Sequence, residues 1–356
     1  MKVGIVTQPL YNNYGGLLQN YALQQVLIRL GHDVKTIDFV YRQSFLNYIL
    51  SVGKQIIRAA IKLQYPQITP YVPIQNFRNP IMGDFVDNYI NTTQIVHSYT
   101  YNLINKEHFE AVITGSDQVW RPMYNVYIQD MYLKFVPDKI KKIAYAASLG
   151  VDTWEYKKAL TRICAKLVKR IDAVSVREET GVNLCQKHLG VDATCVLDPT
   201  ILAGANTYKP LLKEKKGPNY LFAYILDITP AKKEYVEGIA KANNLEIKIH
   251  GADKNAILSV EDWLSMIANA SFVVTDSFHG TVFSILFHRE FYSIVNMQRG
   301  GTRFSSLLNP LGLHERLCDV SPINPLRVIP INWNAVESLL EEKRRNSLDF
   351  LIKSLE

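Results

Sequence analysis

The stretch SFVVTDSFHGTVFSILFHREF, residues 271–291, decides the fold of this chain. It is apolar at both ends, but its middle carries the polar sequence TDSFHG. One interpretation is a buried helix that tolerates a hydrogen-bonded histidine, which would place Gly280 and two residues that favour helix caps inside a helix. We favour a strand that ends at Thr275 and a helix that begins near Gly280, with the polar residues in the turn between them.

The rest of the chain shows a similar alternation of strands and helices. An apolar strand at 3–7 precedes a segment with helical periodicity at 17–31, and a second strand follows at 32–40. A strand, a helix and a strand in this order favour a parallel sheet with a right-handed crossover. A second series of this kind begins at 220, after a lysine-rich stretch. We therefore predict an α/β protein with two Rossmann-like domains whose parallel sheets face each other across a cleft.

These patterns also predict the domain boundaries. Residues 1–205 form the N-terminal Rossmann-like domain and residues 206–330 the C-terminal one, and a long amphipathic helix follows at 331–356. An insertion at about 42–85 interrupts the alternation in the first domain.

The insertion includes a segment with helical periodicity, in which Lys54, Arg58 and Lys62 lie four residues apart on one face. A surface helix packed on its domain is the interpretation we favour. The alternative is a peripheral membrane helix whose cations contact anionic lipid headgroups.

The composition is that of an ordinary globular protein without a membrane span. Of the 356 residues 47% are hydrophobic and 21% charged, and no apolar run reaches the roughly 18 residues of a transmembrane helix. The net charge of +7 suits anionic small molecules or an anionic membrane surface, and no nucleic-acid motif accompanies it. The N-terminus lacks the pattern of a signal peptide, and the four cysteines form no CxxC pair. We therefore expect a cytoplasmic chain with reduced cysteines, no metal site and no nucleic-acid partner.

Polar clusters follow several of the predicted strands. In open parallel sheets, ligands bind beyond the carboxyl ends of the strands, so these clusters supply the candidate site residues. A histidine at a helix N-terminus is placed for proton transfer, and the first amides of a helix bind anions. Two arginines around a Gly-Gly turn suit a phosphate or a carboxylate. The candidates are Asn13, Gly15, Gly16, Ser116, Asp117, Gln118, Arg177, Glu178, Ser277, His279, Gly280, Thr281, Arg299 and Arg303.

Each cluster also has a purely structural interpretation. The sequence Asn-Asn-Tyr-Gly-Gly at 12–16 fits a tight turn, and Asp117 could cap a helix. Arg177 could pair only with Glu178, and His279 could be a structural histidine. The residues alone leave these alternatives open.

Six segments, in their order and spacing, resemble the polysaccharide pyruvyltransferase family across nearly the whole chain. The resemblance implies a GT-B-like fold. It also implies transfer of a pyruvyl group from phosphoenolpyruvate, a co-substrate, to two hydroxyls of a sugar acceptor, which gives a pyruvate ketal and free phosphate without a cofactor. The acceptor could be linked to a lipid or a nucleotide. The segments are YNNYGGLLQNYALQ, TGSDQVW, SVREETG, VLDPT, TDSFHGTVFSILF and RFSSLL.

The resemblance implies roles for the matching residues. The family's histidine corresponds to His279, our candidate acid/base, and its arginine corresponds to Arg177. A basic residue in the loop after the histidine matches Arg299 or Arg303. Many members carry Arg-Leu-His where this chain has Ser-Phe-His at 277–279, so a positive charge is missing beside the histidine.

The two substrates divide the remaining candidates. Phosphoenolpyruvate carries a phosphate and a carboxylate, so its site needs cations and helix amides, which we expect in and near the C-terminal domain. Asp117 is the candidate base. The expected donor-binding residues are Arg177, Ser277, Gly280, Thr281 and one of Arg299 and Arg303. The expected acceptor-binding residues are Asn13, Gly15, Gly16, Ser116, Gln118 and Glu178.

Two other functions fit parts of the sequence. A nucleotide-sugar glycosyltransferase of GT-B fold is the rival enzyme, although no ribose-binding glutamate stands at a clear spacing. A catalytically silent carbohydrate-binding protein is the rival of another class. The missing arginine at position 277 favours that second rival, whereas His279 and Arg177 speak against it.

Overall fold

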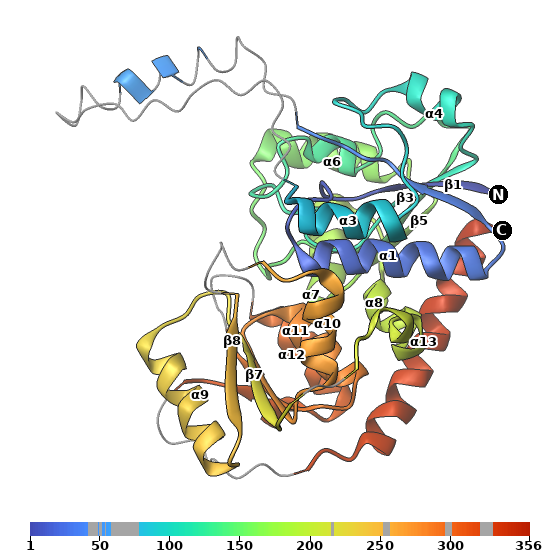
Figure 1. Ribbon diagram of the computed structural model, residues 1–356. Helices are drawn as coiled ribbons and strands as arrows, with labels where there is room; N and C mark the ends of the chain where they lie inside the picture. Colours follow the sequence, from blue (N-terminus) through green and yellow to red (C-terminus); the bar gives the residue numbers. More distant parts are fainter. Residues whose placement is uncertain are drawn as a thin grey trace.

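The computed structural model contains two parallel sheets, one in each half of the chain (Figure 1). The structure describes residues 1–41, 78–214, 217–251, 257–295, 301–320 and 330–356, with a few more between 49 and 57. The strands of the first sheet are β1 (Lys2–Val6), β2 (Asp33–Thr36), β3 (Ala111–Thr114), β4 (Lys141–Ala147), β5 (Ala173–Val176) and β6 (Thr194–Cys195). Those of the second are β7 (Tyr220–Tyr224), β8 (Glu246–His250), β9 (Phe272–Thr275), β10 (Glu290–Ile294) and β11 (Leu317–Cys318).

The strand orders are β2-β1-β3-β4-β5-β6 and β11-β10-β9-β7-β8, and all paired strands run parallel. Helices connect the strands, as parallel pairing requires. In the N-terminal half they are α1 (Tyr14–Arg29), α3 (Pro80–Tyr89), α4 (Tyr101–Glu107), α5 (Ile128–Met131), α6 (Lys158–Val168), α7 (Glu179–Leu184) and α8 (Pro199–Ala203). In the C-terminal half they are α9 (Pro230–Ala242), α10 (Val260–Ala268), α11 (Phe278–Leu286), α12 (Thr302–Leu308) and α13 (Trp333–Leu355).

One hydrophobic core runs through both domains. It joins one face of the first sheet, under α1 and α3, to one face of the second, under α10, α11 and α12. The opposite face of the first sheet packs on α4 and α6, and that of the second packs on α9. Neighbouring residues of β9 alternate between these cores, since Val273 belongs to the shared core and Val274 to the core under α9. The two domains are therefore joined by side-chain packing as well as by the covalent connection of the chain.

The stretch 271–291 folds as a strand, a turn and a helix. The strand β9 ends at Thr275, as predicted. The helix α11 begins at Phe278, two residues before the predicted start, because the Ser277 side chain accepts a hydrogen bond from the Gly280 amide and caps it. His279 therefore lies in the first turn of the helix rather than in the loop before it.

The C-terminal helix returns to the N-terminal domain. In Figure 1, α13 runs from the C-terminal domain to the N-terminal one, and both chain ends lie there. Ser347 accepts a hydrogen bond from the Leu197 amide at 3.0 Å, and Arg344 donates to the carbonyl of Ile201 at 3.1 Å. The predicted helix at 331–356 matches α13, which thus connects the two halves a second time.

Two sequence predictions concern membranes. The basic residues Lys54, Arg58 and Lys62 lie outside the described residues, so the amphipathic helix stays a prediction. Among the helices that the structure describes, none combines the length and the apolar composition needed to cross a bilayer.

Asp276, in the middle of the opening stretch, connects two loops of the C-terminal sheet. Its carboxylate is buried and accepts hydrogen bonds from the amides of Leu226 and Asp227, at 2.7 and 3.2 Å. It also pairs with the ammonium group of Lys232 on α9 at 2.6 Å. This side chain therefore holds the loop after β7 and the start of α9 against the end of β9.

We predict that Asp276→Ala lowers the free energy of unfolding by about 3 to 5 kcal/mol, because the change leaves the Lys232 ammonium buried without its partner. Urea denaturation measures this. The matched control is Glu237→Ala, which removes an exposed ion pair to Lys233 on the same helix and should change the free energy by at most about 1 kcal/mol. Equal effects of the two changes would contradict the structural role of Asp276.

Candidate active site between the two sheets

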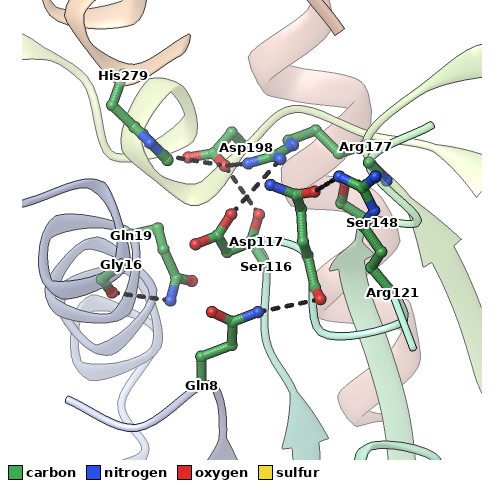
Figure 2. A network of polar contacts seen from close by, with 12 residues as sticks. Gln8, Gly16, Gln19, Ser116, Asp117, Arg121, Ser148, Arg177, Asp198 and His279 are labelled. Carbon is green, nitrogen blue, oxygen red and sulfur yellow. Dashed lines mark hydrogen bonds and ion pairs between the residues drawn. The ribbon is translucent and has the colours of Figure 1, made fainter. Parts of the chain in front are cut away.

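The candidate site lies where the strand ends of the two sheets face each other. Strand order reverses between β1 and β3 in the first sheet and between β7 and β9 in the second. Such reversals open the crevice in which parallel α/β sheets bind ligands. Asp117 follows β3 and His279 follows β9, and both side chains lie near the same group of polar residues (Figure 2). Gly15, after β1, lies against the His279 ring.

Asp198 lies at the centre of this site, and sequence reasoning missed it. Its Oδ2 accepts hydrogen bonds from the Ser116 hydroxyl at 2.8 Å and from Nη1 of Arg177 at 2.7 Å. Its Oδ1 accepts from the amide of Thr200 at 2.9 Å and from the hydroxyl of the same residue. Nε2 of His279, from the other domain, stands 3.8 Å from Oδ2. One carboxylate thus contacts β3, β5, α8 and α11.

The partners of Asp198 decide its ionisation. Burial by itself would raise the pKa of Asp198, but His279, Arg177 and Thr200 outweigh burial and hold this pKa well below its usual range. Asp198 is therefore an anion at any physiological pH. The signal that could have found it is its place after a strand, in VLDPT, since the other candidate residues also follow strand ends.

Arg177 is enclosed by three carboxylates. Besides Asp198, its guanidinium contacts Glu178 at 3.3 Å and Asp117 at 3.9 Å. Burial would lower the pKa of Arg177, but Glu178, Asp198 and Asp117 outweigh burial and raise this pKa above its usual value. Among the described residues, Nη2 is the atom of this side chain that lacks a hydrogen-bond partner. Arg177 therefore holds the three carboxylates together, and its Nη2 group can still donate a hydrogen bond to a ligand.

Phe278 brings the second arginine to the same place. The guanidinium of Arg177 lies 4.5 Å from the centre of the Phe278 ring, and that of Arg303 lies 5.7 Å from it. Burial and then repulsion from Arg177 lower the pKa of Arg303 to about 10. Both arginines prefer a nearby anion, so their joint position on one ring favours an anionic ligand. Arg299, the other predicted basic residue, lies outside the described residues.

A cavity of about 130 Å³ opens beside the two arginines. The N-terminal domain, the C-terminal domain and α13 all contribute to its walls. Lys343 of α13 adds a third basic side chain, opposite the acidic Glu178 and Glu179. The described residues thus provide an enclosed space with cations from three parts of the fold.

His279 is held between an acidic residue and a glycine. Its Nε2 is buried and has no hydrogen-bond partner among the described residues, with Asp198 as the nearest charged group. Its Nδ1 faces Gly15, so closely that a Cβ atom on Gly15 would overlap the ring. The first turn of α1 therefore approaches the imidazole only because position 15 is a glycine.

The start of α11 is occupied by its own hydrogen bonds. The Gly280 amide donates to the Ser277 hydroxyl at 3.3 Å, and the Thr281 amide donates to the Ser277 carbonyl at 3.0 Å. The Thr281 hydroxyl is buried and donates to Ser277 or contacts Ser293. The Ser277 hydroxyl and the amides of Gly280 and Thr281 thus have partners within the helix and its cap, and the expectation that these three residues bind the donor stays a prediction.

Gly280 instead serves helix packing. A Cβ atom there would overlap the Thr275 side chain at the end of β9. The glycine thus lets α11 start directly against the strand.

The predicted acceptor residues separate into enclosed and accessible groups. Ser116 is fully buried, and Glu178 accepts hydrogen bonds from Ser148 at 2.6 Å and Arg177 at 3.3 Å. Asp117 has left-handed backbone geometry, with φ of 69°, and its carboxylate makes a single 3.9 Å ion pair among the described contacts. Asp117 is therefore the carboxylate with most capacity left for a ligand.

Of the remaining acceptor candidates, Gly15 lies against His279, and Asn13, Gly16 and Gln118 have hydrogen-bond or packing contacts of their own. Asn13 is exposed and caps α1, accepting a hydrogen bond from the Gly16 amide at 3.1 Å. The side-chain oxygen of Gln118 accepts from Arg121 at 3.0 Å and packs against Gly150. The structural alternative for residues 12–16 was a tight turn, but Asn13 caps α1, and Gly15 and Gly16 belong to that helix. Asp117, for which a cap was the alternative, caps no described helix.

Within the described part of the chain, no three histidine, cysteine or acidic side chains gather as metal ligands would.

Comparison with known proteins supports both the fold and the family. The model of the family described as polysaccharide pyruvyl transferase matches residues 13–297. No curated protein matches the chain. Among solved structures, the chain is similar to the UDP-GlcNAc 2-epimerase of Methanocaldococcus jannaschii, with 13% identity and a TM-score of 0.51 over 97% of this chain and 93% of that one.

Two further structures show the same similarity at a lower score. The UDP-GlcNAc 2-epimerase of Neisseria meningitidis bound to UDP-GlcNAc has 10% identity and a TM-score of 0.48 over 100% of this chain and 99% of that one. The E. coli heptosyltransferase WaaC with ADP has 14% identity and a TM-score of 0.42 over 96% of this chain and 100% of that one. Such identities show the fold alone. The predicted GT-B-like fold of two parallel-sheet α/β domains is confirmed by the two sheets and by the similarity to the Methanocaldococcus jannaschii structure.

We predict that Gly15→Ala lowers the free energy of unfolding by about 1 to 3 kcal/mol and displaces His279, because the added methyl group overlaps the imidazole. Thermal unfolding and the histidine ring signals in an NMR spectrum measure the two effects. The control is Gly16→Ala, the next position of α1, where the methyl group would meet Asn13 at an ordinary 3.5 Å. Alanine favours helices, so Gly16→Ala should leave stability unchanged or higher. A stabilised Gly15→Ala protein would show that the contact with His279 is absent.

Proposed function

Because the chain belongs to the polysaccharide pyruvyl transferase family, we propose that it transfers the pyruvyl group of phosphoenolpyruvate to two hydroxyls of a sugar. The product is a cyclic pyruvate ketal, and inorganic phosphate is released. The observation that carries the proposal is the cluster around Phe278, where His279 faces Asp198 and two arginines contact one ring. This cluster combines a proton-transfer group with cations for a small, multiply charged anion.

The reaction needs two additions at one carbon. The first sugar hydroxyl bonds to C2 of phosphoenolpyruvate while C3 gains a proton and becomes a methyl group. The second hydroxyl then bonds to C2, the bond from C2 to the phosphate oxygen breaks, and the hydroxyl proton leaves with the phosphate. One group must deliver a proton to carbon, and one must take protons from hydroxyls.

The described side chains can be assigned to these steps. His279 is the proposed acid/base, because imidazole changes protonation near neutral pH and its ring lies at the meeting point of the two domains. Asp198 orients the ring through Nε2. Asp117, the carboxylate with the fewest contacts, is the proposed base or hydrogen-bond acceptor for a sugar hydroxyl.

The donor is proposed to lie beside Arg303. Its guanidinium is buried and lines the cavity, and guanidinium groups suit the planar oxygens of a phosphate or a carboxylate. Arg177 can add one hydrogen bond through Nη2, since its other nitrogens already serve Asp198 and Glu178. The cations of this proposed site thus come from the end of β5 and from α12, whereas position 277 beside His279 carries a serine.

The experiment that tests the function is incubation of the protein with phosphoenolpyruvate and a panel of sugars, free, nucleotide-linked and lipid-linked. Phosphate release that depends on the sugar, together with a ketal in the product, is the expected result. Release of a nucleotide from a nucleotide sugar would instead indicate a glycosyltransferase. Binding of sugars without turnover of either donor would indicate a silent carbohydrate-binding protein.

We predict that His279→Gln lowers the rate of phosphate release by about a hundredfold or more while the protein stays folded, because the proton-transfer group is lost. The control is His288→Gln, at an exposed histidine just after the same helix that pairs with Glu337, and its rate should stay normal. A normal rate for His279→Gln would remove this residue from the mechanism.

We also predict that Arg303→Gln weakens phosphoenolpyruvate binding by about 3 kcal/mol, which is about a hundredfold in Kd. Calorimetric titration measures the loss. Arg316→Gln is the matched control, because Arg316 is equally buried and also lies 5.7 Å from an aromatic ring, that of Tyr292, away from the site. Equal Kd values for the two variants would place the donor elsewhere.

A further inference from the structure

Tyr14 is the first residue of α1, and it inserts into the C-terminal domain. Its ring is buried and stacks on Trp263 of α10, with the ring centres 5.0 Å apart and the planes within 8° of parallel. Tyr224, at the end of β7, and His250, at the end of β8, make edge-to-face contacts with the Tyr14 ring. In each contact the two ring centres are 6.1 Å apart. Three aromatic residues of one domain therefore enclose a side chain of the other.

The Tyr14 hydroxyl fixes the ring in this position. It donates a hydrogen bond to the Leu258 carbonyl at 2.9 Å and accepts one from the amide of the same residue at 3.0 Å. Nε2 of His250 lies 3.2 Å away. Burial raises the pKa of Tyr14 to about 12, so the hydroxyl keeps its proton and remains able to donate. These polar contacts, like the stacking, all cross from the N-terminal to the C-terminal domain.

The neighbouring residue connects this contact to the site. Gly15 lies against Nδ1 of His279, at a distance that leaves no room for a methyl group. The position of Gly15 follows that of Tyr14, because both belong to the first turn of α1. The domain contact at Tyr14 therefore determines how closely α1 covers the imidazole.

We propose that Tyr14 is a positioning residue that seats the start of α1 on the C-terminal domain and so holds Gly15 over His279. This role rests on the proposed function, in which His279 transfers protons. When Tyr14 leaves its place, α1 moves off the ring and the imidazole loses its contact with Gly15. The proposed donor side chains lie elsewhere in the fold, Arg177 directly after β5 and Arg303 within α12, whereas the hydrogen bonds and ring contacts of Tyr14 go to α10 and to the ends of β7 and β8. The effect therefore falls on turnover and spares donor binding.

The test compares Tyr14→Ala and Tyr14→Phe with the same two changes at Tyr21. Tyr21 lies on the same helix, is buried to the same degree and also hydrogen-bonds a backbone carbonyl, that of Thr207. Three quantities are measured for each variant: kcat with phosphoenolpyruvate and the sugar acceptor, Kd for phosphoenolpyruvate, and the rate at which diethyl pyrocarbonate modifies His279. Peptide mass spectrometry follows that modification, with the exposed His314 as internal reference.

We expect Tyr14→Ala to lower kcat by about a hundredfold, as for a misplaced catalytic group, with Kd for the donor unchanged. Modification of His279 should become at least about tenfold faster, because opening of the contact exposes the ring. Tyr14→Phe keeps the stacking and loses the hydrogen bonds, so it should shift both quantities in the same direction by less. The Tyr21 variants should change neither quantity.

Three outcomes overturn the proposal. The first is a His279 modification rate that stays at the wild-type value in both Tyr14 variants. The second is an equal rise in the Tyr21 variants, which would indicate general loosening of α1. The third is a fall in donor affinity that accounts for the whole loss of turnover. If Tyr14→Ala does not fold, Tyr14→Phe decides by the same criteria.

A wild-type protein that releases no phosphate from phosphoenolpyruvate overturns the proposed function, while the modification rates still test the role of Tyr14.

Discussion

The buried carboxylate of Asp198 is the interaction on which the site depends. A buried charge is stable only when partners surround it, and Asp198 receives them from β3, β5 and α8, through Ser116, Arg177 and Thr200. These contacts place the ends of three N-terminal elements at fixed positions around one atom group. Besides these partners, the Asp198 carboxylate faces Nε2 of His279 in the second domain, at 3.8 Å. The positions of the histidine and of Arg177 are thus consequences of satisfying one charge.

Aromatic side chains pack between the two domains on both sides of the Asp198 carboxylate. On one side, Tyr14 fills an aromatic space in the C-terminal domain. On the other, Phe278 of the C-terminal domain packs under Arg177 of the N-terminal one. A single hydrophobic core continues beneath both, and α13 closes the chain back onto the first domain. The two reversals of strand order therefore face each other at a set distance, and the crevice between them contains the candidate acid/base.

Local sequence patterns predicted the parts of this arrangement that depend on neighbouring residues. The end of β9 at Thr275 and the placement of His279 at the start of a helix followed from glycine and cap preferences within a few positions. The polar residues after β3 and β5 were predicted because they directly follow apolar strands. Local patterns did not show that the amides of Gly280 and Thr281 donate hydrogen bonds within α11 and its cap.

The rest depends on contacts between residues far apart in the chain. Asp198 stands 21 residues after Arg177 and 81 residues before His279, and their approach is set by the order of strands in two sheets. Residues next to a motif can likewise have partners that the motif does not contain. Tyr14 lies within the sequence YNNYGG, but its partners are Trp263 and Leu258, in the other half of the chain. No periodicity or spacing encodes such pairings.

The charges of the site indicate how two substrates can share it under the proposed function. Three carboxylates, those of Asp117, Glu178 and Asp198, face two guanidinium groups, those of Arg177 and Arg303, which leaves one excess negative charge in this cluster. The cavity is lined by Arg177, Arg303 and Lys343 as well as by Glu178, Glu179 and Asp198. A donor with a phosphate and a carboxylate would bind at its basic side, at Arg303 and Lys343, and is repelled from the Asp117 carboxylate. Sugar hydroxyls carry no charge and can hydrogen-bond a carboxylate, so the Asp117 side suits the acceptor. Under the proposed function, the donor therefore binds on the side of α12 and α13 and the acceptor on the side of β3, and the His279 ring reaches the shared centre of the site at Asp198.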